Sequence, residues 1–224
     1  MNVVCVSPHP DDIEYGIGGI LCKLAEKDHK ITILVNEKYD FENIHTQETI
    51  ELRRDDSVRA ANLISGDVIF FNLDDPLNEI ANLIRKLQPH IMLIPSCHET
   101  HPIHKLTNQV IMNAIEVAVF TSNDVPGYQV NQIFYYETYS SDVIKPDFII
   151  DVTQVYVKAK KMLKEHKHGI EILPSLPYKF QLYHQLRGFE ASCMYGESLI
   201  MEKHAPYSWK ENRKIGLDIL TEIF

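Results

Sequence analysis

Two short segments of this sequence concentrate the side chains that bind metal ions and transfer protons. The first, His9-Pro10-Asp11-Asp12, places one imidazole and two carboxylates within four residues, directly after the apolar run Val3–Ser7. The second, His98–His104, holds three histidines and one glutamate within seven residues. Packing alone gives no reason to crowd two carboxylates beside an apolar strand. A metal site or a proton-transfer site does, because both use imidazole and carboxylate groups.

The two segments together supply enough ligands for a catalytic divalent metal ion. Zinc at such a site takes three protein ligands and leaves one position for water. His9, Asp12 and His104 are candidates for these ligands, which leaves Asp11 as a base and His101 as the partner of an oxyanion or a leaving group. Because a metal so placed lowers the pKa of water and polarises a carbonyl, these residue types suit the hydrolysis of an amide.

Other interpretations stay open at the level of single residues. Asp12 is also suited to cap a helix, and histidines in a surface loop are commonly solvated. A non-haem iron centre uses two histidines and one carboxylate, and His9 with Asp11 and a distant histidine fits that set. Such iron sites sit mostly on double-stranded β folds, whereas this chain alternates between strand and helix patterns.

Short apolar runs alternate with amphipathic segments over the first half of the chain. This alternation is typical of a Rossmann-like, doubly wound α/β fold, with a mainly parallel sheet and helices on both faces. The carboxyl ends of parallel strands share one edge of such a sheet, so the two segments are expected to meet there. The predicted strands cover Asn2–Ser7, Lys30–Val35, Val68–Asn72 and His90–Pro95, and the predicted helices cover Gly16–Lys27, Thr46–Ile64, Leu77–Leu87 and Lys105–Phe120.

The pattern changes in the second half of the chain. Strands are predicted over Gln132–Tyr139 and Phe148–Val152, and a lysine-rich helix over Tyr156–Glu165. The last 50 residues have a less regular pattern and are interpreted as a C-terminal extension. We expect one domain over residues 1–224, with a Rossmann-like core in residues 1–122 and a C-terminal part, residues 123–224, that completes the sheet and the pocket.

The composition excludes several classes of protein. The net charge of −9 and the lack of a basic cluster argue against nucleic acid as a partner. No run approaches 18 apolar residues, and the first residues lack the pattern of a signal peptide, so neither a membrane span nor secretion is expected. The four cysteines are scattered and form no CxxC motif, which favours a reducing, cytoplasmic setting.

The glycine-rich run Gly16-Ile17-Gly18-Gly19 invites comparison with a dinucleotide-binding loop. Its pattern is G-x-G-G rather than G-x-G-x-x-G, and it begins well after the first strand. His9–Asp12 occupies the turn where phosphate would lie, and two carboxylates there repel phosphate. We therefore predict close helix packing for these glycines and no nucleotide.

At its two acid- and histidine-rich segments the sequence resembles the LmbE-like, or PIG-L, family of zinc-dependent de-N-acetylases. Members carry an HPDD-E motif after the first strand and an HPDH motif after a later one. Here the first motif reads His9-Pro10-Asp11-Asp12-Ile13-Glu14, and the second reads His101-Pro102-Ile103-His104. The ending Ile13–Gly16 is most similar to the small bacterial branch that includes the bacillithiol-pathway deacetylases. Supporting matches lie at Arg53–Gly66, Asp147–Thr153 and Arg187–Ser198.

The resemblance implies an activity and a role for each matching residue. It implies removal of an N-acetyl or similar small acyl group from an amino sugar or its conjugate, with one zinc ion per subunit and homo-oligomeric assembly. His9, Asp12 and His104 would bind the zinc, Asp11 would be the general base that activates a zinc-bound water, and His101 would stabilise the tetrahedral intermediate. Weaker candidates for substrate contacts are Arg53, Glu14 and His184, the last because it follows an aromatic stretch.

One departure from the family pattern motivates a second hypothesis. Ile103 stands where the family has an aspartate that could orient or tune the neighbouring histidine. Its loss is consistent with a non-catalytic protein that keeps the fold and binds a metal and a ligand. Retention of Asp11 argues against this hypothesis, because the metal does not need that carboxylate.

The histidines of His166-Lys167-His168 are predicted to be structural. They follow the predicted helix Tyr156–Glu165, and positive charge at the C-terminus of a helix is stabilising. His166 matches only the first residue of a family H-x-S-Q motif.

Overall fold

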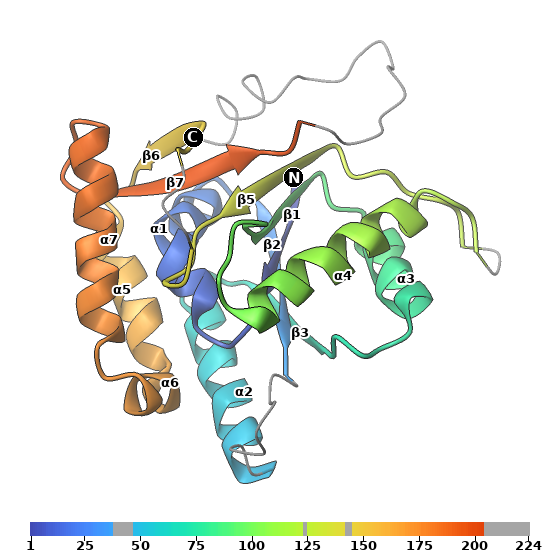
Figure 1. The fold of residues 1–224 in the computed structure, drawn as a ribbon, viewed down its shortest axis with the longest axis horizontal. Coiled ribbons are helices and arrows are strands. Elements are labelled where there is room, and N and C mark those ends of the chain that lie inside the picture. Colours follow the sequence, from blue (N-terminus) through green and yellow to red (C-terminus); the bar gives the residue numbers. More distant parts are fainter. Residues whose placement is uncertain (38–46, 123–124, 142–144, 204–224) are drawn as a thin grey trace.

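The computed structural model describes residues 1–37, 47–122, 125–141 and 145–203, and it is built around one seven-stranded sheet (Figure 1). The strand order is β3-β2-β1-β4-β5-β7-β6. The first five strands are parallel to one another, and β7 runs antiparallel to both of its neighbours. The strands are β1 Asn2–Ser7, β2 Lys30–Asn36, β3 Asp67–Phe71, β4 Ile91–Pro95, β5 Gln132–Tyr136, β6 Phe148–Asp151 and β7 Gly196–Met201. The predicted doubly wound α/β fold with a mainly parallel sheet is confirmed.

Helices cover both faces of the sheet, which explains why the central strands β1 and β4 are apolar on both faces. Along β1, Val3 and Cys5 pack into one core cluster and Val4 and Val6 into the other. The first cluster lies under α1, α2, α5 and α7, and the second lies under α3 and α4. The helices are α1 Asp12–Glu26, α2 Gln47–Asn62, α3 Leu77–Leu87, α4 Pro102–Ala118, α5 Tyr156–Glu165, α6 Lys167–Ile172 and α7 Leu176–Glu190.

Two helices begin earlier than predicted, and both shifts bring site residues onto helices. α1 begins at Asp12 rather than at Gly16, and it kinks at Ile17, where φ is −141°. Asp12 is therefore the first helical residue and not a cap; the preceding Asp11 occupies the cap position without a side-chain capping bond. α4 begins at Pro102 instead of Lys105, which places His104 in its first turn.

The C-terminal part is more regular than the sequence indicated. The prediction of an irregular extension is wrong for residues 176–201, which form α7 and the inner strand β7. The sequence did not predict this strand because its first residue, Gly196, is followed by Glu197 and Ser198, two polar residues that the protein buries completely. The rest of the predicted extension, residues 204–224, lies outside the described part of the chain.

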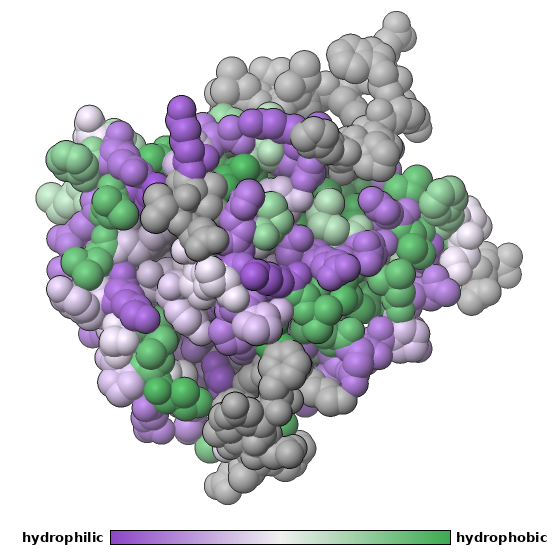
Figure 2. Space-filling model, viewed as in Figure 1, coloured by the Kyte–Doolittle hydropathy of each residue, from purple (hydrophilic) through white to green (hydrophobic). Residues whose placement is uncertain are grey.

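The surface seen in the orientation of Figure 1 is mixed in character. Figure 2 shows hydrophilic residues spread over much of this face, with hydrophobic residues in several separate groups between them. Within the described residues, every helix is too short or too polar to cross a bilayer.

Candidate metal centre and active site

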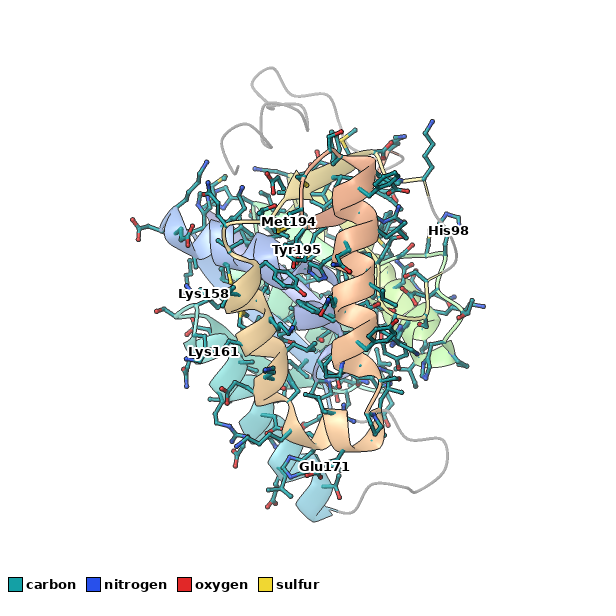
Figure 3. All side chains as sticks on the ribbon, turned by 90° about the vertical axis from the view of Figure 1, so that its left-hand side faces the viewer. His98, Lys158, Lys161, Glu171, Met194 and Tyr195 are labelled. Atoms are coloured by element: carbon teal, nitrogen blue, oxygen red, sulfur yellow. The ribbon has the colours of Figure 1, made fainter. Side chains whose placement is uncertain are left out.

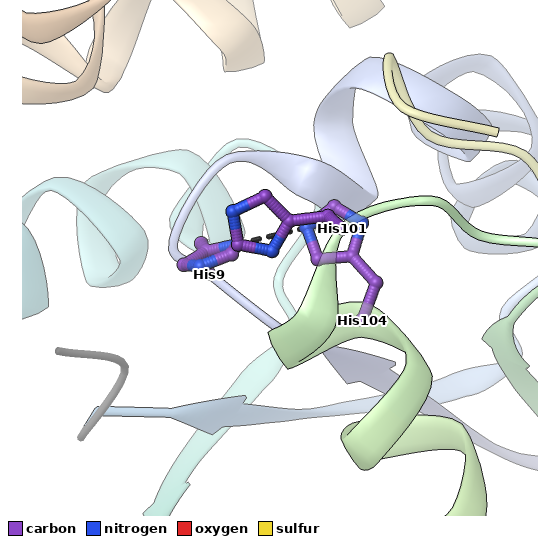
Figure 4. A group of neighbouring side chains, drawn as sticks. All are labelled: His9, His101 and His104. Carbon is purple, nitrogen blue, oxygen red and sulfur yellow. Dashed lines mark hydrogen bonds between the residues drawn. The ribbon is translucent and has the colours of Figure 1, made fainter. Parts of the chain in front are cut away.

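The two segments singled out in the sequence meet at the carboxyl edge of the sheet. β1 and β4 are parallel neighbours, so the loop after Ser7 and the loop after Pro95 emerge side by side. Figure 4 shows His9 on the first loop and His101 and His104 at the start of α4, with all three rings turned toward one another. The start of α4 is favoured locally, because Pro102 stands in its first turn and the Nδ1 atom of His101 accepts from the backbone N–H of Ile103 at 3.3 Å.

His9, Asp12 and His104 form a closed triangle of side-chain atoms. The Nδ1 atom of His9 lies 2.9 Å from the Nε2 atom of His104, and each of these nitrogens lies 3.0 Å from the Oδ2 atom of Asp12. Four donors around one zinc ion at about 2.0 Å would stand about 3.3 Å apart, which is close to this spacing. The arrangement thus gathers two imidazoles and one carboxylate around one point.

The donor set of this triangle fits a divalent cation. The Oδ1 atom of Asp12 is buried and has no hydrogen-bond partner among the described residues. Asp12 and His104 are 0 % exposed, so water does not solvate these groups from outside. His101 offers a further donor, because one nitrogen each from His9, His101 and His104 lie within 4.8 Å of one another. His101 is the more exposed of these histidines and does not belong to the triangle.

The acids around His104 favour positive charge at the triangle. Burial alone would lower the pKa of His104, but Asp12 and Glu99 raise it to about 10. Burial would likewise raise the pKa of Asp12, but His104 and His9 hold it well below its usual range. His9 behaves differently, because burial lowers its pKa to about 4. The net electrostatic preference of the pocket is for a cation beside Asp12.

Glu99 orients His104 from the far side, a role that the sequence did not reveal. Its Oε2 atom lies 3.0 Å from the Nδ1 atom of His104 and accepts hydrogen bonds from Thr138 at 2.9 Å and Ser140 at 2.6 Å. The backbone N–H of Thr138 also bonds Ser141, whose hydroxyl donates to the other carboxylate oxygen. These hydrogen bonds therefore fix the orientation of the Glu99 carboxylate that contacts the ring of His104. A carboxylate behind a metal-binding histidine is a common means of fixing its tautomer and orientation.

Asp11 lies beside the triangle in a strained backbone conformation. Its φ is 140°, which side chains other than glycine rarely adopt. The Nη2 atom of Arg53 lies 3.2 Å from the Oδ2 atom of Asp11 and also donates to the carbonyl oxygen of Pro10. Burial raises the pKa of Asp11 to about 7, against the opposing effect of Arg53. Arg53, predicted as a substrate contact, thus binds the carboxylate of Asp11 in this structure.

Comparison with known proteins places this site in a family. The family model described as "PIG-L: GlcNAc-PI de-N-acetylase" matches residues 4–115, which is half of the 224-residue chain and contains both segments of the site. The chain belongs to the PIG-L family.

Individual relatives of this PIG-L protein are distant in sequence. Diacetylchitobiose deacetylase of Thermococcus kodakarensis is 23% identical over 189 residues, covering 74% of this chain and 69% of the relative. Among solved structures, N,N'-diacetylchitobiose deacetylase of Pyrococcus horikoshii has a TM-score of 0.76 at 18% identity, covering 92% of this chain and 87% of that one. GalB, the 4-carboxy-2-hydroxymuconate hydratase of Pseudomonas putida KT2440, has a TM-score of 0.75 at 19% identity, covering 95% and 100%. The structural similarities establish the fold alone.

Two histidines outside the residues matched by the PIG-L model are buried. His184 is 0 % exposed, and its ring nitrogens lie 2.8 Å from the carbonyl oxygen of Phe180 and 2.8 Å from Glu197. Both ring nitrogens of this predicted substrate contact therefore have partners inside the core. His166 is also buried, with its Nε2 atom 3.0 Å from the Oε2 atom of Glu14, so it occupies a structural position inside the protein. Glu14, the remaining substrate candidate, is buried in this contact.

Proposed function

We propose that this PIG-L protein is a metal-dependent hydrolase that removes an acetyl or similar small acyl group from the nitrogen of an amino sugar or its conjugate. The observation that carries the proposal is the buried triangle of His9, Asp12 and His104 with Asp11 beside it. Family membership and the diacetylchitobiose deacetylases among the relatives support the choice of reaction and of substrate class.

His9, Asp12 and His104 would hold the metal ion. Bound there, a divalent ion such as zinc supplies Lewis acidity toward the acyl carbonyl and lowers the pKa of water. The two carboxylates Asp12 and Glu99 help to balance its charge.

Asp11 would act as general base and then as general acid in this hydrolysis. Its carboxylate takes a proton from the attacking water as the new carbon–oxygen bond forms, and it delivers that proton to the amine nitrogen as the carbon–nitrogen bond breaks. A carboxyl whose pKa is raised to about 7 is suited to both steps near neutral pH. The products are acetate, or another small acid, and the free amine.

His101 would donate a hydrogen bond to the oxygen that gains negative charge. Its Nδ1 atom accepts from the N–H of Ile103, so the neutral ring carries its proton on Nε2. Burial and His104 lower the pKa of His101, which favours this neutral form. The ring can therefore act as a donor without the aspartate that Ile103 replaces.

The alternative functions account for fewer observations. The iron-centre hypothesis needs Asp11 as a ligand, but Asp12 completes the triangle and Asp11 faces Arg53. A protein that only bound a metal and a ligand would not need Asp11, and this hypothesis does not explain its strained backbone conformation. Hydration of an unsaturated acid is a second candidate, because a hydratase shares this fold.

The test is a panel of N-acetylated sugars and sugar conjugates, read out as release of acetate by the zinc-loaded protein. We expect turnover of at least one compound and its loss after treatment with a chelator, restored by added zinc. Release of no acid from any compound, together with hydration of an unsaturated carboxylic acid, would establish the second candidate instead.

The carboxylate of Glu99 gives a separate prediction about metal affinity. Glu99→Gln keeps the size of the side chain but removes the charge behind His104, so we expect metal affinity to fall about 10–100-fold. Competition with a coloured chelator measures the affinity. Glu79→Gln, on the exposed start of α3, is the matched control and should leave it unchanged. Equal affinity of the two variants would show that Glu99 does not act on the metal ligand.

A further inference from the structure

The segment His166–Gly169, which consists of the residue between α5 and α6 and the first residues of α6, packs against Asp11 of the site although the reaction described above gives it no role. Figure 3 shows α6, marked by Glu171, as the short turn that links the neighbouring ends of α5 and α7. α6 also packs against α2, the helix that carries Arg53. The segment therefore lies where it can act on the pair formed by Arg53 and Asp11.

Two histidines fasten this segment to two different helices. The Nε2 atom of His166 lies 3.0 Å from the Oε2 atom of Glu14 on α1, and both side chains are buried. The backbone N–H of His168 donates to the Oδ2 atom of Asp56 on α2 at 3.1 Å, and its Nδ1 atom lies 3.0 Å from the same oxygen. Asp56 is only 1 % exposed. The two neighbours of Lys167 in the sequence thus attach the segment to α1 and to α2.

Gly169 is the point at which the segment meets Asp11. A Cβ atom added to Gly169 would lie 2.2 Å from the Oδ2 atom of Asp11 and 3.7 Å from the Nη2 atom of Arg53. This oxygen is the one that Arg53 binds at 3.2 Å. The backbone of Gly169 therefore forms one wall of the space that the carboxylate occupies, and only a residue without a side chain leaves that space open.

The conformation of Asp11 indicates that such support is needed. A non-glycine residue at a φ of 140° is strained by about 1–3 kcal/mol and keeps that conformation only where its surroundings enforce it. Arg53 restrains the carboxylate from one direction, and Gly169 limits it from another. Displacement of a reacting group by about 1 Å is enough to reduce a rate 10²-fold.

We propose that the segment His166–Gly169 is a positioning element that fixes the carboxylate of Asp11 for proton transfer, with Gly169 as its contact residue and His166 and His168 as its anchors. The proposal rests on the proposed function, in which Asp11 is the base. It assigns a positioning role to His166 and His168, which the sequence alone predicts to be structural.

The first experiment compares Gly169→Ala with Gly18→Ala. An added Cβ at Gly18 would meet Ala159 at an ordinary contact distance of 3.4 Å, so this variant controls for a glycine replaced on a helix. For Gly169→Ala we expect kcat to fall about 10–100-fold with KM within threefold and an unchanged metal content. Gly18→Ala should keep kcat within about threefold. A Gly169→Ala kcat equal to that of the control would overturn the proposal.

A thermodynamic cycle tests the contact without any substrate. Gly169→Ala should lower Tm by about 3–10 °C in the wild-type background, because overpacking and strain cost stability. In an Asp11→Ala background the same change should lower Tm by less than about 2 °C, since the clashing carboxylate is gone. Equal losses in the two backgrounds would show that Gly169 does not act on Asp11. If the wild-type protein hydrolyses no compound of the panel, the proposed function fails, and this cycle still decides the contact.

The anchor His168 provides a variant that adds no atom to the site. His168→Ala should lower kcat about 3–10-fold at unchanged KM and metal content, because the segment loses its side-chain link to Asp56. His168→Asn keeps a side-chain donor and should recover most of the lost kcat. If His168→Ala keeps full kcat, or if both variants lose kcat equally in step with Tm, the link to Asp56 has no positioning role.

Discussion

Asp11→Asn is expected to reduce kcat about 10²–10⁴-fold while the protein keeps its metal and its fold. The range is that of a general acid–base residue in other hydrolases. Asparagine has the size of aspartate and tolerates positive φ better than most residues, so it can adopt the backbone conformation of Asp11. What it lacks is the ability to accept a proton from water and pass it to the amine. Steady-state kinetics, with metal analysis of the same samples, measures the effect.

Asp28→Asn is the matched control for this change. Asp28 also has a positive φ, 56°, but it is exposed in the turn after α1. We expect its kcat to stay within about twofold of the wild type. Full deacylation by Asp11→Asn with metal bound would show that Asp11 is not the base. It would also leave the strained conformation of Asp11 without a catalytic explanation.

The sequence was sufficient to predict the sheet and the meeting of the two segments. Strands β1, β2 and β4 are buried on both faces, and the edge strand β3 is partly buried, so each appears in the sequence as a short, mainly apolar run. Because all four are parallel, their carboxyl ends had to share one edge. His9 and His104, 95 residues apart, could be assigned to one site for this reason alone.

The C-terminal elements could not be predicted because their polar residues are buried by distant partners. Glu197 of β7 accepts from the backbone N–H groups of Gly19 and Ile20 at 2.7 Å each and contacts His184 at 2.8 Å. Both N–H groups lie just after the kink of α1 at Ile17, and they donate to the side chain of Glu197. No local pattern reveals such a contact across 178 residues. Glu99 contacts His104 directly, but its carboxylate is held by hydrogen bonds from the distant residues Thr138 and Ser140, which no local pattern predicts.

Ile103, which stands where the family has an aspartate, contacts His101 through its backbone. Ile103 is buried, and its backbone N–H fixes the Nδ1 atom of His101. Glu99, meanwhile, supplies a carboxylate to His104 rather than to His101. The tautomer of His101 is therefore determined by the start of α4, and the missing acid does not by itself remove the proposed donor from the site.

Asp12→Ala is expected to weaken metal binding by more than the 10–100-fold typical of an outer-shell change, and to abolish turnover at metal concentrations that saturate the wild type. Asp12 touches both other members of the triangle, so its loss removes a donor and the negative charge that favours a cation. Metal at 100 times its Kd stabilises a folded protein by about 2.7 kcal/mol, which is a rise in Tm of about 5–11 °C at this chain length. Thermal scans with and without zinc should show this rise in the wild type and not in Asp12→Ala.

His101→Ala decides between the two donor sets that share His9 and His104. If His9, Asp12 and His104 hold the metal, His101→Ala keeps the zinc-dependent rise in Tm and loses kcat, because only the oxyanion donor is removed. If the three histidines hold it, His101→Ala loses the rise and Asp12→Ala retains part of it. We expect the first outcome from the contacts, since His101 lies outside the triangle while Asp12 is buried within it and its Oδ1 atom has no hydrogen-bond partner among the described residues. The opposite outcome would make Asp12 an orienting acid and would move the proposed oxyanion donor to another residue.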